Sequence, residues 1–215
     1  MKQKQLMNVY KCLLEAYGAQ DWWPADSTFE VIVGSVLTQN TAWTNVEKAI
    51  ANLKRSNCLT LESILALSDD ELAKLIRPSG YFNIKTKRLK NLCLWIAENG
   101  GEAKLKEVNT ATLRLSLLQV NGVGPETADD ILLYAFARPV FVIDTYTRRL
   151  FSKLGLIEGD EPYETLRENI EAELESDVSL FSQYHALIVR HAKEKCLNLA
   201  DCKHCQVEDM KIQVI

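Results

Sequence analysis

The sequence lacks any run of apolar residues long enough to span a bilayer, and its first residues do not show the pattern of a secretory signal. We therefore expect a cytoplasmic protein with no membrane partner. Because the cytoplasm keeps thiols reduced, the six cysteines are not expected to pair as three disulfides. The chain also lacks internal repeats and low-complexity tracts, so its 215 residues can build one sizeable core or two small lobes.

An excess of positive charge is also missing. The chain carries 25 Lys and Arg against 29 Asp and Glu, which gives a net charge of −4 and a pI of about 5.5. This balance excludes a uniformly basic nucleic-acid binder, but it leaves room for a local basic face. Basic residues do gather locally, at residues 85–90, 148–153 and 190–195.

Strand signals are nearly missing too, since only residues 140–143 resemble a strand. Hydrophobic residues make up 47% of the chain and recur at helical spacing. Ser27 with Glu30, and Ser68 with Glu71, have the spacing of capping boxes ahead of such helices. Helices are also predicted over residues 112–119, 126–137, 145–154, 162–175 and 179–195. The pattern predicts an all-α fold of many short helices joined by tight turns.

The most informative stretch is residues 117–136. An apolar helix end is followed by Gly122, Val123 and Gly124, and Pro125 then stands at the favoured first position of a new helix. The two glycines permit unusual backbone conformations and a close approach of a ligand. Their N–H groups and the following helix N-terminus can bind a phosphate without any net positive charge. Alone, the pattern fits a phosphate-binding hairpin and an ordinary helical corner equally well.

Asp144 lies between an apolar segment and the start of a predicted helix. On its own such a carboxylate is usually an N-cap. A Gly-x-Gly hairpin followed by a downstream Asp, however, resembles the helix-hairpin-helix DNA glycosylases of the endonuclease III superfamily. In that family the Asp lies at the mouth of the base pocket.

The resemblance implies a two-lobed, endonuclease III-like all-α fold. Residues 25–136 would form one helical lobe that ends in the hairpin. Residues 1–24 and 137–215 would form a terminal lobe that carries Asp144 and a cysteine tail. The DNA groove would lie between the lobes, with Asp144 facing the hairpin lobe.

Other segments match the family in the same order. Residues 37–41, Leu-Thr-Gln-Asn-Thr, resemble the segment that carries a DNA-inserting glutamine, and residues 79–89 resemble the one whose wedge fills the space left by a flipped base. The basic residues beside the wedge position favour phosphate contacts. The implied DNA-binding residues are Gln39, Tyr81 (the wedge), Asn83, Lys85, Gly122, Val123, Gly124 and Thr127. The implied partner is double-stranded DNA with a damaged base, bound by a monomer.

The position after the hairpin indicates the type of chemistry. Bifunctional members of the family, which are also lyases, carry there a lysine that forms a Schiff base with the sugar. This chain has Glu126 at that position, followed by Thr127 and Ala128 in register with the family motif. Since a carboxylate cannot form an imine, we expect a monofunctional glycosylase that uses water. Asp144 would activate the water or stabilise the cationic sugar electrostatically.

Tryptophans indicate the substrate. Three of the four in the chain, Trp22, Trp23 and Trp43, lie near the expected pocket. Aromatic faces stack on flipped bases and attract cations, and 3-methyladenine is cationic while it is attached to the sugar. With Pro24 and the Arg-Pro-Ser-Gly segment at residues 77–80, they resemble the bacterial 3-methyladenine glycosylase III branch. By this resemblance Trp22, Trp23, Pro24 and Trp43 line the base pocket; the competing interpretation makes some of them plain core residues.

The cysteine tail resembles the iron–sulfur loop of the superfamily but departs from it. Cys196, Cys202 and Cys205 are present, one residue is missing between the first two, and Lys211 stands where a fourth cysteine is expected. Three thiolates with an external ligand, zinc with His204 or His191, and a loop without metal stay open. We expect at most a weak cluster absorbance.

Three functions stay open at this point. The first is an alkylpurine glycosylase. The second is an endonuclease III-like glycosylase for oxidised or mismatched bases, whose neutral substrates need hydrogen bonds to the base edge more than a tryptophan pocket. The third is a non-enzymatic DNA-binding protein that uses the hairpin alone, which the presence of Asp144 disfavours.

Overall fold

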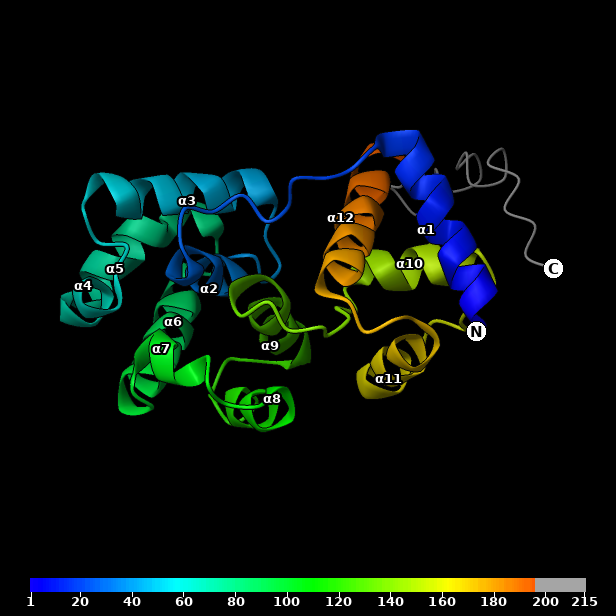
Figure 1. Cartoon of the computed structure of the whole chain (residues 1–215). Coiled ribbons are helices and arrows are strands. Elements are labelled where there is room, and N and C mark those ends of the chain that lie inside the picture. Colours follow the sequence, from blue (N-terminus) through cyan, green and yellow to red (C-terminus); the bar gives the residue numbers. More distant parts are fainter. Residues whose placement is uncertain (196–215) are drawn as a thin grey trace. The chain divides into compact units, whose positions relative to one another are not determined.

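The structure, a computed structural model, describes residues 1–195 (Figure 1). Every regular element in this part is a helix, which confirms the all-α prediction. The chain forms two compact units. The internal unit is Trp23–Arg138, and the terminal unit combines Met1–Trp22 with Pro139–Ile215. Among the described residues, none of the helices has the length and apolar character that crossing a membrane requires.

The internal unit is built around one buried helix. Its elements in chain order are α2 (Thr28–Leu37), α3 (Trp43–Arg55), α4 (Leu61–Ala66), α5 (Asp69–Ile76), the short 3-10 helix η1 (Arg77–Ser79), α6 (Phe82–Glu98), α7 (Gly101–Leu105), α8 (Thr110–Leu117), α9 (Pro125–Asp130) and the π-helical turn η2 (Ile131–Ala135). All residues of α2 except the first are buried, and α2 contacts α3, α6, α9 and η2. The apolar residues that recur at helical spacing in this helix are therefore only part of its buried surface.

Side-chain caps start two of these helices where the sequence predicts them. The Ser68 hydroxyl accepts a bond from the Glu71 N–H, and the Glu71 carboxylate accepts one from the Ser68 N–H, which completes a capping box. Ser27 also caps α2, but Glu30 bonds to the N–H of Asp26 instead of that of Ser27. The bond from the Glu30 carboxylate thus goes to the residue before the N-cap, so this capping box is incomplete.

A buried ion pair joins the two helices on either side of the hairpin. Arg114 of α8 donates from Nε and Nη2 to the two carboxylate oxygens of Asp129 in α9, at 2.6 and 3.0 Å. Such a bidentate pair fixes geometry as well as distance. The helix predicted over residues 126–137 is interrupted, because α9 ends at Asp130 and continues as η2.

The terminal unit packs around α12 (Val178–Lys195). This helix contacts α1 (Gln3–Tyr17) and α10 (Thr145–Lys153), and α11 (Tyr163–Glu173) completes the unit. The buried Tyr184 hydroxyl of α12 donates to the Leu6 carbonyl of α1 at 2.8 Å. Residues 140–143 are buried but form no strand: the Phe141 ring lies edge-on to Phe181 and Tyr184 of α12. The apolar character of this run is explained by packing against helices.

Candidate functional site

The turn between α8 and α9 has the backbone that its glycines permit. Gly122 has φ of +100°, and a Cβ atom there would lie 2.2 Å from Cγ of Arg88. Both the conformation and the close contact therefore require glycine. Gly124 is the N-cap of α9, and a Cβ at this position would point into open space. Val123 between them is buried and anchors the turn. We call residues 121–124 the hairpin turn.

The first turn of α9 carries Glu126, which the sequence resemblance places at the lysine position of the family motif. Pro125 opens the helix and Gly124 supplies no side-chain cap. Glu126 is exposed beside the hairpin turn, whereas Thr127 is buried. A carboxylate thus occupies the accessible position at which an imine-forming lysine would be needed.

Gln39 follows α2 and lies against the hairpin turn. Its Nε2 donates to the Gly122 carbonyl at 3.0 Å and to the Thr127 hydroxyl at 2.9 Å. Its Oε1 accepts from Nη1 of Arg88 at 2.6 Å. The resemblance predicts that this glutamine inserts into DNA, but it does not predict these contacts. Arg88 lies in the basic run at residues 85–90, for which phosphate contacts were expected instead of a bond to Gln39.

Lys85 is placed differently from the prediction. Its side chain is buried, and the ammonium donates to the Leu37 carbonyl at 2.7 Å, the Thr41 hydroxyl at 2.6 Å and the Ser79 carbonyl at 2.8 Å. Burial, and to a lesser extent the charge of the Arg88 guanidinium, lower the pKa of this ammonium to about 8. A phosphate contact predicted for Lys85 is wrong for this conformation, because all three N–H bonds are directed to interior oxygens.

Tyr81 and Asn83 are both accessible at the start of α6. Tyr81 is the N-cap, has φ of +45°, and is 68% exposed. A large aromatic residue rarely combines a left-handed backbone with exposure to water when its role is only structural. Asn83, two residues further along, is exposed, as is the apolar Ile84. The wedge role of Tyr81 remains a prediction.

Two of the predicted pocket tryptophans contact each other in the internal unit. The Trp23 and Trp43 rings lie edge-on with centroids 5.1 Å apart, and Tyr134 of η2 lies 5.4 Å from Trp23. A Cβ at Gly34 of α2 would lie 2.9 Å from the Trp23 ring, so glycine permits this packing. We call these three rings the aromatic cluster; Tyr134 has no motif that would have predicted it. Pro24 is exposed.

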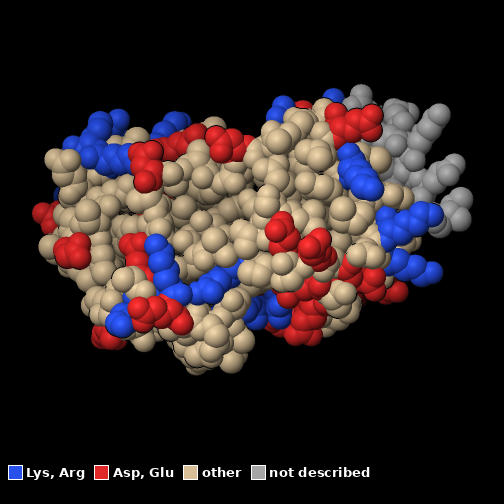
Figure 2. All heavy atoms as spheres, in the orientation of Figure 1, with Lys and Arg blue, Asp and Glu red and all other residues tan. Residues whose placement is uncertain are grey.

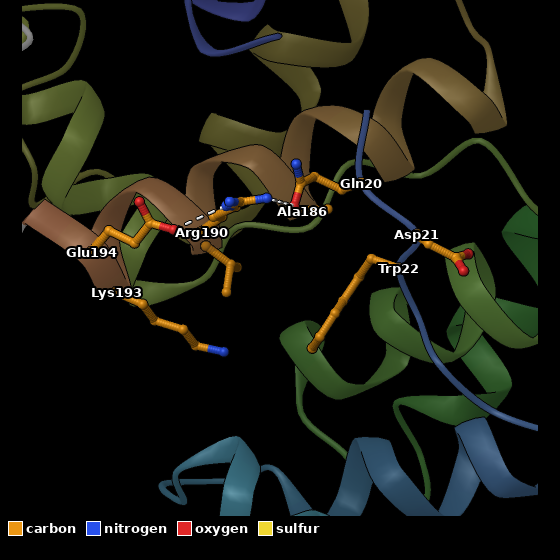
Figure 3. A pocket seen from close by; sticks show the side chains of 8 residues that line it. Gln20, Asp21, Trp22, Ala186, Arg190, Lys193 and Glu194 are labelled. Atoms are coloured by element: carbon orange, nitrogen blue, oxygen red, sulfur yellow. Dashed lines mark hydrogen bonds and ion pairs between the residues drawn. The ribbon is translucent and has the colours of Figure 1, made fainter. Parts of the chain in front are cut away.

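Trp22 belongs to the terminal unit, where it lines a pocket with residues of α12 (Figure 3). The Lys193 ammonium lies 5.4 Å from the centre of its indole ring, a cation–π distance. Arg190 lines the same pocket and donates to Glu194 at 3.0 Å and to Gln20 at 3.2 Å. A cation thus already lies over the Trp22 face.

Asp144 is the N-cap of α10. One carboxylate oxygen accepts from the Thr147 N–H at 2.7 Å, and the other lies 3.5 Å from Nε2 of His185. The side chain is only 12% exposed. Burial alone would raise the pKa of Asp144, but the bonds and charge of His185, with those of Thr147, outweigh it and hold the pKa below its ordinary value. The carboxylate is therefore ionised at neutral pH.

Positive and negative side chains are interspersed on the face shown in Figure 2, so no single basic patch dominates it. Several residues of the basic clusters have partners within the protein. Lys90 bonds to Asp69 at 2.7 Å, and Arg148 donates to the Glu161 carbonyl at 2.8 Å. The local basic face expected from the sequence is therefore weaker than the number of basic residues suggests.

The three cysteines of the predicted metal site, Cys196, Cys202 and Cys205, lie outside the described residues. His191 is described: it is buried, and its Nδ1 lies 2.9 Å from the Tyr17 hydroxyl. Burial, and then the charges of Lys153 and Lys195, lower the pKa of His191. Within residues 1–195 no group of three His, Cys, Asp or Glu side chains is placed to hold a metal.

The family model of the HhH-GPD superfamily base excision DNA repair proteins matches residues 33–176, which include the hairpin turn and Asp144. The chain belongs to this family. A relative from Methanocaldococcus jannaschii, named "Putative DNA repair glycosylase MJ1434", is 47% identical over 211 residues, which are 97% of this chain and 96% of the relative. Endonuclease III of Sulfolobus acidocaldarius is 27% identical over 85% of this chain and 81% of its own length.

Solved structures of the family have the same fold. Helicobacter pylori 3-methyladenine DNA glycosylase MagIII, bound to 1,N6-ethenoadenine, matches with a TM-score of 0.74 and 31% identity over 91% of this chain and 99% of its own. A non-covalent endonuclease III–DNA complex matches with a TM-score of 0.81 and 20% identity over 98% and 95%. The endonuclease III-like fold and the similarity to MagIII, both expected from the sequence, are confirmed.

Proposed function

We propose that the chain is a monofunctional DNA N-glycosylase that hydrolyses the N-glycosidic bond of a flipped alkylated purine such as 3-methyladenine. The observation that carries the proposal is the state of Asp144, a carboxylate kept ionised by Thr147 and His185 at the start of α10. Membership of a base excision repair family and 31% identity to a 3-methyladenine glycosylase support it.

Departure of the base leaves positive charge on the sugar, and a fixed negative charge stabilises that charge most when it is already ionised and oriented. Asp144 meets both conditions without any rearrangement of its own side chain. The same carboxylate can accept a proton from the attacking water, so both roles remain compatible with its geometry. An alkylated purine leaves readily and needs little acid catalysis, which fits a site whose one proposed catalytic group is the Asp144 carboxylate.

The proposed substrate class rests on the aromatic cluster. A cationic base gains about 0.5–2 kcal/mol from a neighbouring aromatic face in addition to stacking. An excision assay should compare duplexes that contain 3-methyladenine, 1,N6-ethenoadenine, 8-oxoguanine or a T·G mismatch. Preferential release of the alkylated purine supports the proposal. Preferential release of 8-oxoguanine or of mismatched thymine would favour the second candidate, and binding without release of any base would favour the third.

Trp43→Leu should lower the rate of 3-methyladenine excision by about tenfold or more, since stacking on one aromatic ring contributes roughly 1–3 kcal/mol per base. Trp95→Leu is the matched control, because Trp95 is a partly buried tryptophan of α6 outside the aromatic cluster. Single-turnover excision rates measure the effect. Equal rates for Trp43→Leu and wild type would assign this ring to the core.

The wild-type protein should release the base and leave an intact abasic strand, which breaks only on treatment with alkali or heat. Borohydride should trap no covalent adduct, because Glu126 cannot form an imine. Glu126→Lys is the matched variant, since it places an amine at the exposed position beside the hairpin turn. A borohydride adduct of the wild type that disappears when another lysine is replaced would refute the monofunctional assignment.

A further inference from the structure

The side-chain amide of Gln39 joins three parts of the internal unit. Both of its N–H bonds are used, one on the Gly122 carbonyl and one on the Thr127 hydroxyl, and its oxygen accepts from Arg88. The arrangement fixes the orientation of the amide, because the flipped amide would direct its oxygen at the two acceptors and its N–H groups at a guanidinium. The turn after α2 is thereby bonded to the hairpin turn, to α9 and to α6.

Arg88 strengthens this connection from the other side. A Cβ at Gly122 would meet both Cγ and Cβ of Arg88, at 2.2 and 2.8 Å, so the arginine stem lies directly on the hairpin turn. The guanidinium at the end of that stem bonds to the Gln39 oxygen. Gly122 is thus held on its carbonyl by Gln39 and packed against the stem of Arg88.

The backbone that carries Gln39 is itself fixed. Lys85 bonds to the Leu37 carbonyl before it and to the Thr41 hydroxyl after it. The Thr41 hydroxyl also bonds to the Gln39 and Ser79 carbonyls. Because α6 supplies both Lys85 and Arg88, the amide of Gln39 has a defined position relative to that helix before any DNA is present.

We propose that Gln39 is a positioning residue for the hairpin turn: in the DNA-free protein its amide, with Arg88, holds Gly122 and Thr127 in the conformation that binds phosphate. The inference rests on the DNA binding assumed in the proposed function. Preorganisation of this kind raises affinity by removing the cost of ordering the loop on binding. It therefore acts on every duplex, damaged or not. New hydrogen bonds from the Gln39 amide to a duplex require that its bonds to Gly122 and Thr127 break first, since the amide has no further N–H to donate.

Gln39→Leu provides the central test, because it keeps the size of the side chain and removes all three hydrogen bonds. Amide hydrogen exchange of residues 121–127 in the DNA-free protein should become about tenfold faster, and affinity for an undamaged duplex should fall by about tenfold. Gln119→Leu makes the same chemical change at an exposed glutamine ahead of the hairpin turn and should change neither value. Both measurements are independent of base excision, so failure of the proposed activity would leave this test intact.

Two further variants keep the test decisive should Gln39→Leu fold poorly. Gln39→Glu retains an oxygen for Arg88 but directs a carboxylate at the Gly122 carbonyl, so exchange in residues 121–127 should still accelerate. Arg88→Met should accelerate exchange too. Exchange in the double variant should be no faster than in the faster of the two single variants, as expected for groups that act through one contact. Unchanged exchange and unchanged affinity for undamaged DNA in the Gln39 variants would overturn the inference, and so would a loss of affinity confined to damaged duplexes.

Discussion

Replacement of Asp144 by Asn should lower the rate of base excision by on the order of 100-fold or more and leave the fold and the DNA affinity in place. One preorganised electrostatic group usually contributes a rate effect of this size. The substitution removes the negative charge that the developing sugar cation requires. The shape of the side chain and its cap on Thr147 are kept, while the charge interaction with His185 is lost together with the negative charge.

The structural role of Asp144 makes the substitution unusually selective. Its oxygen accepts the Thr147 N–H at the start of α10, and Asn is as good an N-cap as Asp. Asp144→Ala is the matched comparison, because it loses both the charge and the cap, and should also cost about 1 kcal/mol of stability. Single-turnover excision, a melting temperature and a binding titration separate the two variants. Full activity of Asp144→Asn would contradict the proposed mechanism.

The pH dependence of excision follows from the same environment. His185 and Thr147 hold the pKa of Asp144 below its ordinary value of 3.8. The ionised form is thus still present at a pH at which a free aspartate would already be half protonated. In a folded enzyme, protonation of Asp144 is therefore not expected to lower the excision rate between about pH 5 and 8. The stability that these bonds contribute is present above the ordinary pKa and is lost as the pH falls through the lowered value.

Local sequence signals predicted the parts of the site that depend on neighbouring residues. Gly122 is recognisable because its left-handed backbone and its close contact favour glycine, whereas Gly124 has an extended backbone and open space at its Cβ position. The N-cap geometry of Asp144 follows from its place before a helix. The backbone of Gly122 and the cap of Asp144 are determined within a few residues along the chain, whereas the contact of Gly122 with Arg88 is not.

Contacts between distant segments could not be predicted from such local sequence signals. Gln39 and Gly122 are brought together by the packing of α2 against α9, and nothing in the pattern around residue 39 indicates a partner so far along the chain. Tyr134, in the π-helical turn that follows α9, contacts Trp23 from a distant part of the chain. Lys85 shows the limit most clearly: it belongs to a run of basic residues that looks exposed, yet its ammonium bonds to three oxygens, two from residues 37–41 and one from Ser79.

The burial of Lys85 leads to the second large expected effect: Lys85→Met should destabilise the protein by about 3 kcal/mol at pH 7. Methionine fills the space of the lysine stem but leaves the Leu37 carbonyl, the Thr41 hydroxyl and the Ser79 carbonyl without this donor. Each buried polar group that loses its partner costs about 1–3 kcal/mol, and Ser79 and Thr41 keep a bond to each other. Lys87→Met, at an exposed position of the same helix, should change stability by no more than about 0.5 kcal/mol.

The pH dependence of this difference tests the cause. In the folded protein burial lowers the pKa of Lys85 to about 8, from an ordinary value of 10.5 in the unfolded chain. Between these two values the unfolded state binds more protons, so the free energy of unfolding of the wild type gains a contribution that grows with pH. Lys85→Met has no such contribution, and the gap between the two proteins should widen from pH 8 toward pH 10. Urea unfolding at pH 7, 8 and 9.5 measures it, with Lys87→Met as the reference. A gap that stays constant would mean that the ammonium keeps its ordinary pKa despite its burial, and a gap near zero at every pH would mean that its three bonds do not stabilise the fold.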